Sequence, residues 1–159
     1  PLGPITVVNL LGRVFMNPVD CPFRAMDAVL KAVPANVPVL LDFHAEATSE
    51  KIAMGYYLDG RVAAVFGTHT HVQTSDAAIL PKGTAYMTDL GMTGSAYSVI
   101  GREIAPVLKK FTTGIPAKFE VAGGLCVLEG AFLELDRQTG KAVSITPYRF
   151  REEASEAGV

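Results

Sequence analysis

Cysteine is scarce in this sequence, charge of one sign is not in excess, and long hydrophobic runs are missing. The two cysteines, Cys21 and Cys126, lie far apart in the 159 residues, so a disulfide framework is not expected and a reducing cytoplasm suits the chain. Fourteen basic and sixteen acidic side chains give a net charge of −2, which argues against binding to nucleic-acid polymers or anionic membranes. No apolar run approaches the roughly 18 residues that a membrane span needs.

Apolar residues, in contrast, are abundant and make up 49% of the chain. They must be buried against both faces of a sheet, against a second copy in a homo-oligomer, or against a segment that this sequence lacks. The start, PLGPITVVNLLG, has no initiator Met and no basic signal-peptide region, and it enters an apolar strand at once. We therefore expect a cytoplasmic chain that is truncated at its N-terminus.

Strand and helix patterns alternate over the first two thirds of the chain. Apolar, β-branched runs predict strands at residues 5–12, 37–43 and 61–66. Helical spacing predicts helices at residues 23–33 and 98–111, and a further helix runs from a cap at Thr48 or Ser49 to a stop at Asp59-Gly60. This order predicts a mixed α/β architecture.

The last third changes to an antiparallel pattern. Two turns are expected, at Glu129-Gly130 and at Asp136 to Gly140. Residues 1–150 are then expected to belong to a single domain, and residues 151–159 form a polar tail that we expect to be frayed.

All three histidines directly follow predicted strands. His44 follows the strand at 37–43, and His69 and His71, in GTHTHV, follow the strand at 61–66. Ligands of parallel α/β sheets gather beyond the carboxyl ends of the strands, and residues i and i+2 of an extended chain point the same way. A single histidine is more often an ordinary loop or core residue, but this arrangement favours metal binding, since neutral imidazole is the commonest metal ligand.

These histidine motifs also carry a resemblance to a known family. The stretch LLDFHAEATSEKIAMGYYLDGRVAAVFGTHTHVQTSDAAILPKGTAYMTDLGMTG resembles the second half of the YmdB-like family, bacterial phosphodiesterases within the calcineurin-like metallophosphoesterases. The likeness is close over residues 39–101 and continues more loosely through KFEVA and LELDRQTGKA.

The resemblance implies a fold, a centre and a substrate class. The fold would be a metallophosphoesterase β-sandwich flanked by helices, in four α/β/β/α layers, of which this chain is the C-terminal half. The centre would hold two divalent or trivalent metal ions, with Fe or Mn preferred and Zn as the alternative. His44 and His69 would bind one ion and His71 the other. The substrates would be small phosphodiesters, 2′,3′-cyclic nucleotides in this family, and the proton-donating histidine would belong to the missing half.

Charge limits what three imidazoles can do alone. They can hold one ion, as in His₃ zinc sites, but they cannot neutralise two dications without a bridging carboxylate. This chain by itself is therefore expected to bind one metal weakly and to hydrolyse poorly. Two alternatives remain open: a non-catalytic metal-binding or interaction module, and a mononuclear zinc hydrolase.

Other polar residues are weaker candidates. Asp42 is expected to face away from His44, in a structural role or in support of a ligand, and Thr70 could donate a hydrogen bond near the site. Asp89 is expected either to hydrogen-bond a ligand histidine or to stabilise a turn. Glu50 is interpreted as a charge at a helix start, and Cys126 as a buried small hydrophobe.

Overall fold

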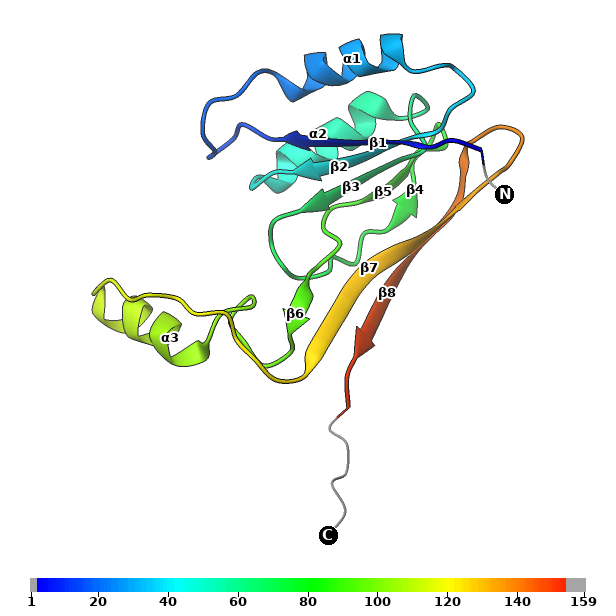
Figure 1. Ribbon diagram of the computed structural model, residues 1–159. Helices are drawn as coiled ribbons and strands as arrows, with labels where there is room; N and C mark the ends of the chain where they lie inside the picture. The colour runs from blue at the N-terminus through cyan, green and yellow to red at the C-terminus, as the bar shows by residue number, and fades with distance from the viewer. Residues whose placement is uncertain (1–2, 154–159) are drawn as a thin grey trace.

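A five-stranded sheet forms the body of the computed structural model, which describes residues 3–153 (Figure 1). Its strand order is β1-β2-β3-β5-β4, with β1, β2, β3 and β5 parallel and β4 antiparallel to β5. The strands are β1 (Thr6–Leu11), β2 (Val39–His44), β3 (Ala64–Thr68), β4 (Ala78–Ile79) and β5 (Ala85–Met87). The expected parallel order of the first three strands is confirmed.

Two helices, α1 (Pro22–Ala32) and α2 (Thr48–Leu58), pack on one face of this sheet. Right-handed crossovers from β1 to β2 and from β2 to β3 place both helices on the same side, because the three strands are laid down in order. The core between the helices and the sheet contains Met26, Leu41, Phe43, Met54 and Leu58, all with no exposed surface.

The opposite face of the sheet is only partly covered. Along β2, buried residues alternate with half-buried ones, and Asp42 and His44 belong to the half-buried set. On the edge strand β1, the exposed fraction is 67% for Val7 and 45% for Leu11. This less covered face is the one that carries the polar residues of the candidate site.

The C-terminal part forms a second, antiparallel sheet of β6 (Thr93–Ser95), β7 (Cys126–Leu135) and β8 (Ala142–Arg151). The expected turn at Glu129-Gly130 is wrong, since both residues lie within β7 and pair with Arg149 and Tyr148. The turn at Asp136 to Gly140 is confirmed, and Asp136 stabilises it by accepting hydrogen bonds from Thr139. The predicted mixed α/β fold with flanking helices is thus confirmed, and its four-layer arrangement stays a prediction.

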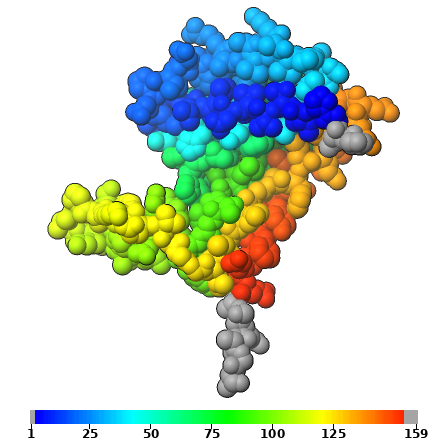
Figure 2. Space-filling view, viewed as in Figure 1, coloured from blue at the N-terminus to red at the C-terminus, as the bar shows by residue number. Residues whose placement is uncertain are grey.

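The third helix begins later than the apolar pattern indicates. Helix α3 comprises Ile104–Thr113, whereas the helix was expected from residue 98. Ile100 and Gly101 have positive φ angles of 46° and 90°, which no helix accommodates, so residues 98–103 form a turn instead. Helix α3 protrudes from the body as an arm (Figure 2).

The polar tail also begins later than expected. Strand β8 continues to Arg151, and the Glu152 N–H still donates to the Cys126 carbonyl, so pairing reaches beyond the predicted boundary at residue 151. The remainder of the predicted tail, residues 154–159, lies outside the described residues. Among the helices of residues 3–153, none is long and apolar enough to cross a membrane.

Candidate functional site

The parallel register brings the histidine-bearing segments to one edge of the sheet. His44 is the last residue of β2 and lies directly opposite Thr68, the last residue of β3. His69 follows at once, and the His44 and His69 rings meet edge to face with centroids 5.3 Å apart and planes at 75°. The prediction that two strands deliver imidazoles to the same edge holds for this pair.

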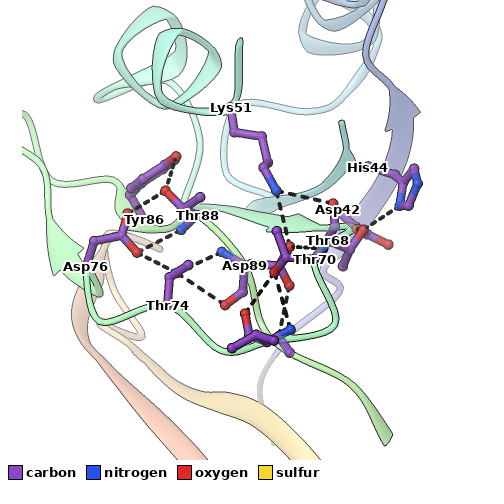
Figure 3. Close-up of polar contacts among 12 residues, drawn as sticks. Asp42, His44, Lys51, Thr68, Thr70, Thr74, Asp76, Tyr86, Thr88 and Asp89 are labelled. Atoms are coloured by element: carbon purple, nitrogen blue, oxygen red, sulfur yellow. Dashed lines mark hydrogen bonds and ion pairs between the residues drawn. The ribbon is translucent and has the colours of Figure 1, made fainter. Parts of the chain in front are cut away.

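A chain of polar contacts fixes the His44 ring (Figure 3). His44 Nδ1 lies 3.0 Å from Thr68 Oγ1, and the same hydroxyl donates to Asp42 Oδ1 at 3.5 Å. Asn9 Nδ2 donates to the other oxygen of this carboxylate at 2.8 Å. The hydroxyl can accept from His44 Nδ1–H while it donates to Asp42, and Nε2 is the ring nitrogen that this chain of contacts does not use.

Asp42 therefore lies on the same face as His44, and the expectation that it faces away is wrong. Residues i and i+2 of a strand share a face, so the alternation of β2 places both side chains on the less covered side of the sheet. The sequence left two roles open for Asp42, a structural one and the support of a ligand. Its contact with the Thr68 hydroxyl, which in turn contacts His44, matches the support of a ligand.

His71 points elsewhere. Its Nδ1 lies 3.0 Å from the carbonyl oxygen of Ile100, which can only accept, so Nδ1 is the donor in this contact. The ring lines a cavity of about 500 Å³ whose wall also includes Met92, Val99, Glu129 and Arg149. Across residues 3–153, the structure gathers no group of three or more His, Cys, Asp or Glu side chains around one ion position.

The segment that bears His69 and His71 has an unusual backbone. The φ angle is 145° at His69 and 60° at His71, in the region that non-glycine residues seldom adopt. Such conformations cost on the order of 1–3 kcal/mol each and persist only where the surroundings impose them.

A buried ion pair supplies part of these surroundings. Lys51 Nζ lies 3.1 Å from Asp89 Oδ2, and the exposed fractions of the two side chains are 1% and 0% (Figure 3). Lys51 also donates to the Thr68 carbonyl at 3.4 Å, while Asp89 Oδ2 accepts from the Thr70 N–H at 2.8 Å and Oδ1 from the Gly91 N–H at 3.0 Å. Of the two roles expected for Asp89, these contacts match the turn-stabilising one.

Lys51 is the functional candidate that the sequence analysis missed. It lies in helix α2 among residues with an ordinary helical pattern, and its partner Asp89 is 38 positions away. The sequence held one signal for this pair: Lys51 and Asp89 are charged residues that each lie in a largely apolar stretch. Thr70, proposed as a hydrogen-bond donor near the site, uses its hydroxyl for the Val72 carbonyl at 2.9 Å.

Two further expectations change with the structure. Glu50 lies in the first turn of α2 as expected, but its buried carboxylate also accepts hydrogen bonds from the backbone N–H groups of Arg13 and Val14. It thereby holds the loop that follows β1. Cys126 is exposed, and the expectation that it is buried is wrong, because alternation along β7 buries Val127 instead.

A second polar cluster lies at the end of β5 and joins Thr74, Asp76, Tyr86 and Thr88. Asp76 accepts hydrogen bonds from Thr74 and Thr88, and Thr88 in turn contacts the Tyr86 hydroxyl (Figure 3). Burial pushes the pKa of the Asp76 carboxyl upward, but the hydrogen bonds from Thr74 and Thr88 outweigh it and leave the pKa below its usual value. Burial raises the pKa of Tyr86 to about 12.

Comparison with known proteins identifies relatives for most of the chain. A family model described as "YmdB-like protein" matches residues 2–148. The 2′,3′-cyclic-nucleotide 2′-phosphodiesterase of Bacillus subtilis is 50% identical over 142 residues, which are 89% of this chain and 54% of that protein. A putative phosphatase/phosphodiesterase of Mycoplasma pneumoniae is 38% identical over 152 residues, 94% of this chain and 54% of that protein. The chain thus spans about half the length of the curated relatives it matches.

Solved structures give the same result. A hypothetical protein from Thermus thermophilus superposes with a TM-score of 0.84 at 50% identity, covering 92% of this chain and 57% of that one. A novel phosphatase from Mycoplasma pneumoniae also gives a TM-score of 0.84, at 37% identity, covering 94% of this chain and 54% of that one.

Proposed function

Because the chain belongs to the YmdB-like family, we propose that it carries part of the active site of a metal-dependent phosphodiesterase that hydrolyses 2′,3′-cyclic nucleotides. The observation that carries the proposal is the edge-to-face pair of His44 and His69 at the ends of two adjacent parallel strands. The name of the relative from Bacillus subtilis supports the substrate class. We further propose that the protein works in the cytoplasm.

The donor chemistry of these histidines fits a metal. His44 and His71 each engage Nδ1 with an oxygen atom, so that Nε2 is the nitrogen available to a metal, the arrangement typical of metal-ligating histidines. Ring centroids 5.3 Å apart suit two imidazoles that share one ion at bond lengths of about 2.0–2.1 Å. We propose Fe or Mn, with Zn as the alternative, and His71 as a ligand of a second ion. When bound, such ions supply Lewis-acid polarisation of the phosphoryl group.

The described residues do not complete a two-metal site. Two dications need a bridging carboxylate, and residues 3–153 place no carboxylate together with two imidazoles around one ion position. We propose that the remaining ligands and the proton-donating histidine lie outside this chain. Its own residues hold His44 and His69 in fixed orientations, and the cavity beside His71 offers room for the organic part of the substrate, with the Arg149 guanidinium at its wall.

The test is the replacement His69→Ala in the full-length protein that contains this chain. Hydrolysis of a 2′,3′-cyclic nucleotide and of bis-p-nitrophenyl phosphate should fall by at least about 100-fold, because an imidazole ligand is lost. The fold should survive, since His69 lies in a loop at the sheet edge and not in the core. Unchanged turnover of both substrates in the folded variant would refute the proposal.

A metal count on the same protein separates the alternatives. Two ions per molecule with hydrolysis support the proposal. One tightly held ion without hydrolysis indicates a non-catalytic metal-binding module, and one ion with hydrolysis indicates a mononuclear zinc hydrolase.

A further inference from the structure

The buried pair of Lys51 and Asp89 joins three separate parts of the fold. Lys51 projects from α2 and contacts the backbone of Thr68 at the end of β3, whereas Asp89 follows β5 and contacts the backbone of Thr70 just beyond β3 (Figure 3). The Thr68 carbonyl accepts from Lys51 and the Thr70 N–H donates to Asp89, so the two contacts flank His69 on either side. One ion pair thereby fixes both peptide groups next to the strained His69 backbone.

Stability alone is a poor reason for such a pair. Removing two charges from water carries a large desolvation penalty, and apolar residues of similar volume are often as stabilising as a buried ion pair. The core of the same domain uses apolar residues at such buried positions, since Leu41, Met54 and Val65 are fully or almost fully buried. What an apolar pair cannot provide is a donor for the Thr68 carbonyl and an acceptor for the Thr70 N–H.

The backbone of the histidine segment needs these partners. At His69 the φ angle is 145°, and this residue would relax toward negative φ if its two flanking peptide groups were free to rotate. Relaxation at His69 would turn its ring away from His44, whose own orientation is fixed separately by Thr68 and Asp42. The imidazole pair therefore depends on the two peptide groups that the ion pair fixes.

We propose that Lys51 and Asp89 are positioning residues, which hold the backbone at His69 in the conformation that presents its imidazole to a metal. Both side chains act through the Thr68 and Thr70 backbone and not through the imidazoles themselves. The consequence for hydrolysis rests on the proposed function, whereas the consequence for the conformation of the histidine segment does not.

The experiment compares Lys51→Met and Asp89→Asn with the unmodified full-length protein. Lys51→Met keeps the buried volume and removes the donor to the Thr68 carbonyl. Asp89→Asn keeps one acceptor oxygen and removes the negative charge. Asp89→Asn serves as the second variant if Lys51→Met does not fold. In metal-free protein, the imidazole ¹H–¹⁵N signals of His69 should shift or broaden in both variants, while the ¹⁵N shifts that report the tautomer of His44 stay the same. Affinity for added Co²⁺ should fall about 10- to 100-fold, the usual effect of losing a group that orients a ligand.

Asp59→Asn is the matched control. Asp59 is also a buried carboxylate that follows α2 and accepts backbone N–H groups, from Lys82 and Thr84, but at the other end of the strands. This control should lower the thermal stability and leave the His69 signals and the Co²⁺ affinity unchanged. Equal changes in the control, or unchanged His69 signals in folded Lys51→Met and Asp89→Asn, would overturn the proposal. Failure of the unmodified protein to bind Co²⁺ would refute the proposed function alone, because the His69 signals still report on positioning.

Discussion

The Thr68 hydroxyl shows how one residue can decide the chemistry of a neighbouring imidazole. It accepts from His44 Nδ1 and donates to Asp42, so the His44 proton is held on the nitrogen that faces the protein. Asn9 fixes the far oxygen of the Asp42 carboxylate, which orients the whole chain of contacts from the adjacent strand β1. The engagement of His44 Nδ1 thus depends on three side chains on three strands.

Replacement of Thr68 by Val tests this arrangement. Valine has the same shape without the hydroxyl, so His44 should populate both tautomers, which ¹⁵N chemical shifts of the ring report directly. Co²⁺ affinity of the full-length protein should fall about 10-fold or more, because a group that orients the ligand is lost. Thr68→Ser keeps the hydroxyl and should restore both properties. A single Nδ1–H tautomer in Thr68→Val would show that the hydroxyl does not set the proton position.

At the scale of elements, close contact between β3 and the segment after β5 sets the geometry of the sheet edge. A Cβ atom at Gly67 would overlap the Thr88 carbonyl oxygen and lie 2.5 Å from the Lys51 side chain. Only glycine allows this approach, which brings Asp89 within reach of the Thr70 N–H.

Gly67→Ala should therefore destabilise the protein by about 1–3 kcal/mol through overpacking. The lost stability is measured as a lower midpoint of urea unfolding with an unchanged m-value. Gly130→Ala in β7 is the control, since a Cβ there meets nothing within 4 Å and the midpoint should hardly move. A midpoint for Gly67→Ala equal to that of the control would mean that the two segments separate at little cost.

The sequence predicts an element correctly where a local pattern of residues determines it. The three parallel strands and the placement of His44 and His69 follow from apolar runs and from the parallel topology, so both could be predicted. The start of α3 depends on a left-handed residue, Ile100, that carries no turn signature in the sequence. The Lys51–Asp89 pair depends on tertiary packing between residues 38 positions apart, which no local pattern indicates.

At the scale of the whole molecule, apolar side chains remain exposed on several surfaces at once. On the β7–β8 hairpin, the cross-strand pair Leu128 and Phe150 is exposed by 44% and 52%. On the protruding helix α3, Leu108 and Phe111 are exposed by 53% and 75% (Figure 2). Exposed apolar side chains that lie next to each other, such as this cross-strand pair, are expected at a contact with another chain or segment.

The 159-residue chain alone should therefore self-associate, with an average mass in sedimentation equilibrium that rises with concentration. The hairpin pair is the part of this surface most suited to a flat contact, because its two side chains lie directly opposite each other across the strands. Leu128→Ser with Phe150→Ser should weaken the association by about 10-fold or more, since burial of two large apolar side chains is lost. Tyr56→Ser, which changes a side chain on α2 that is 61% exposed, should have little effect. A monomeric chain at all concentrations would mean that these apolar residues are tolerated in water and mark no interface.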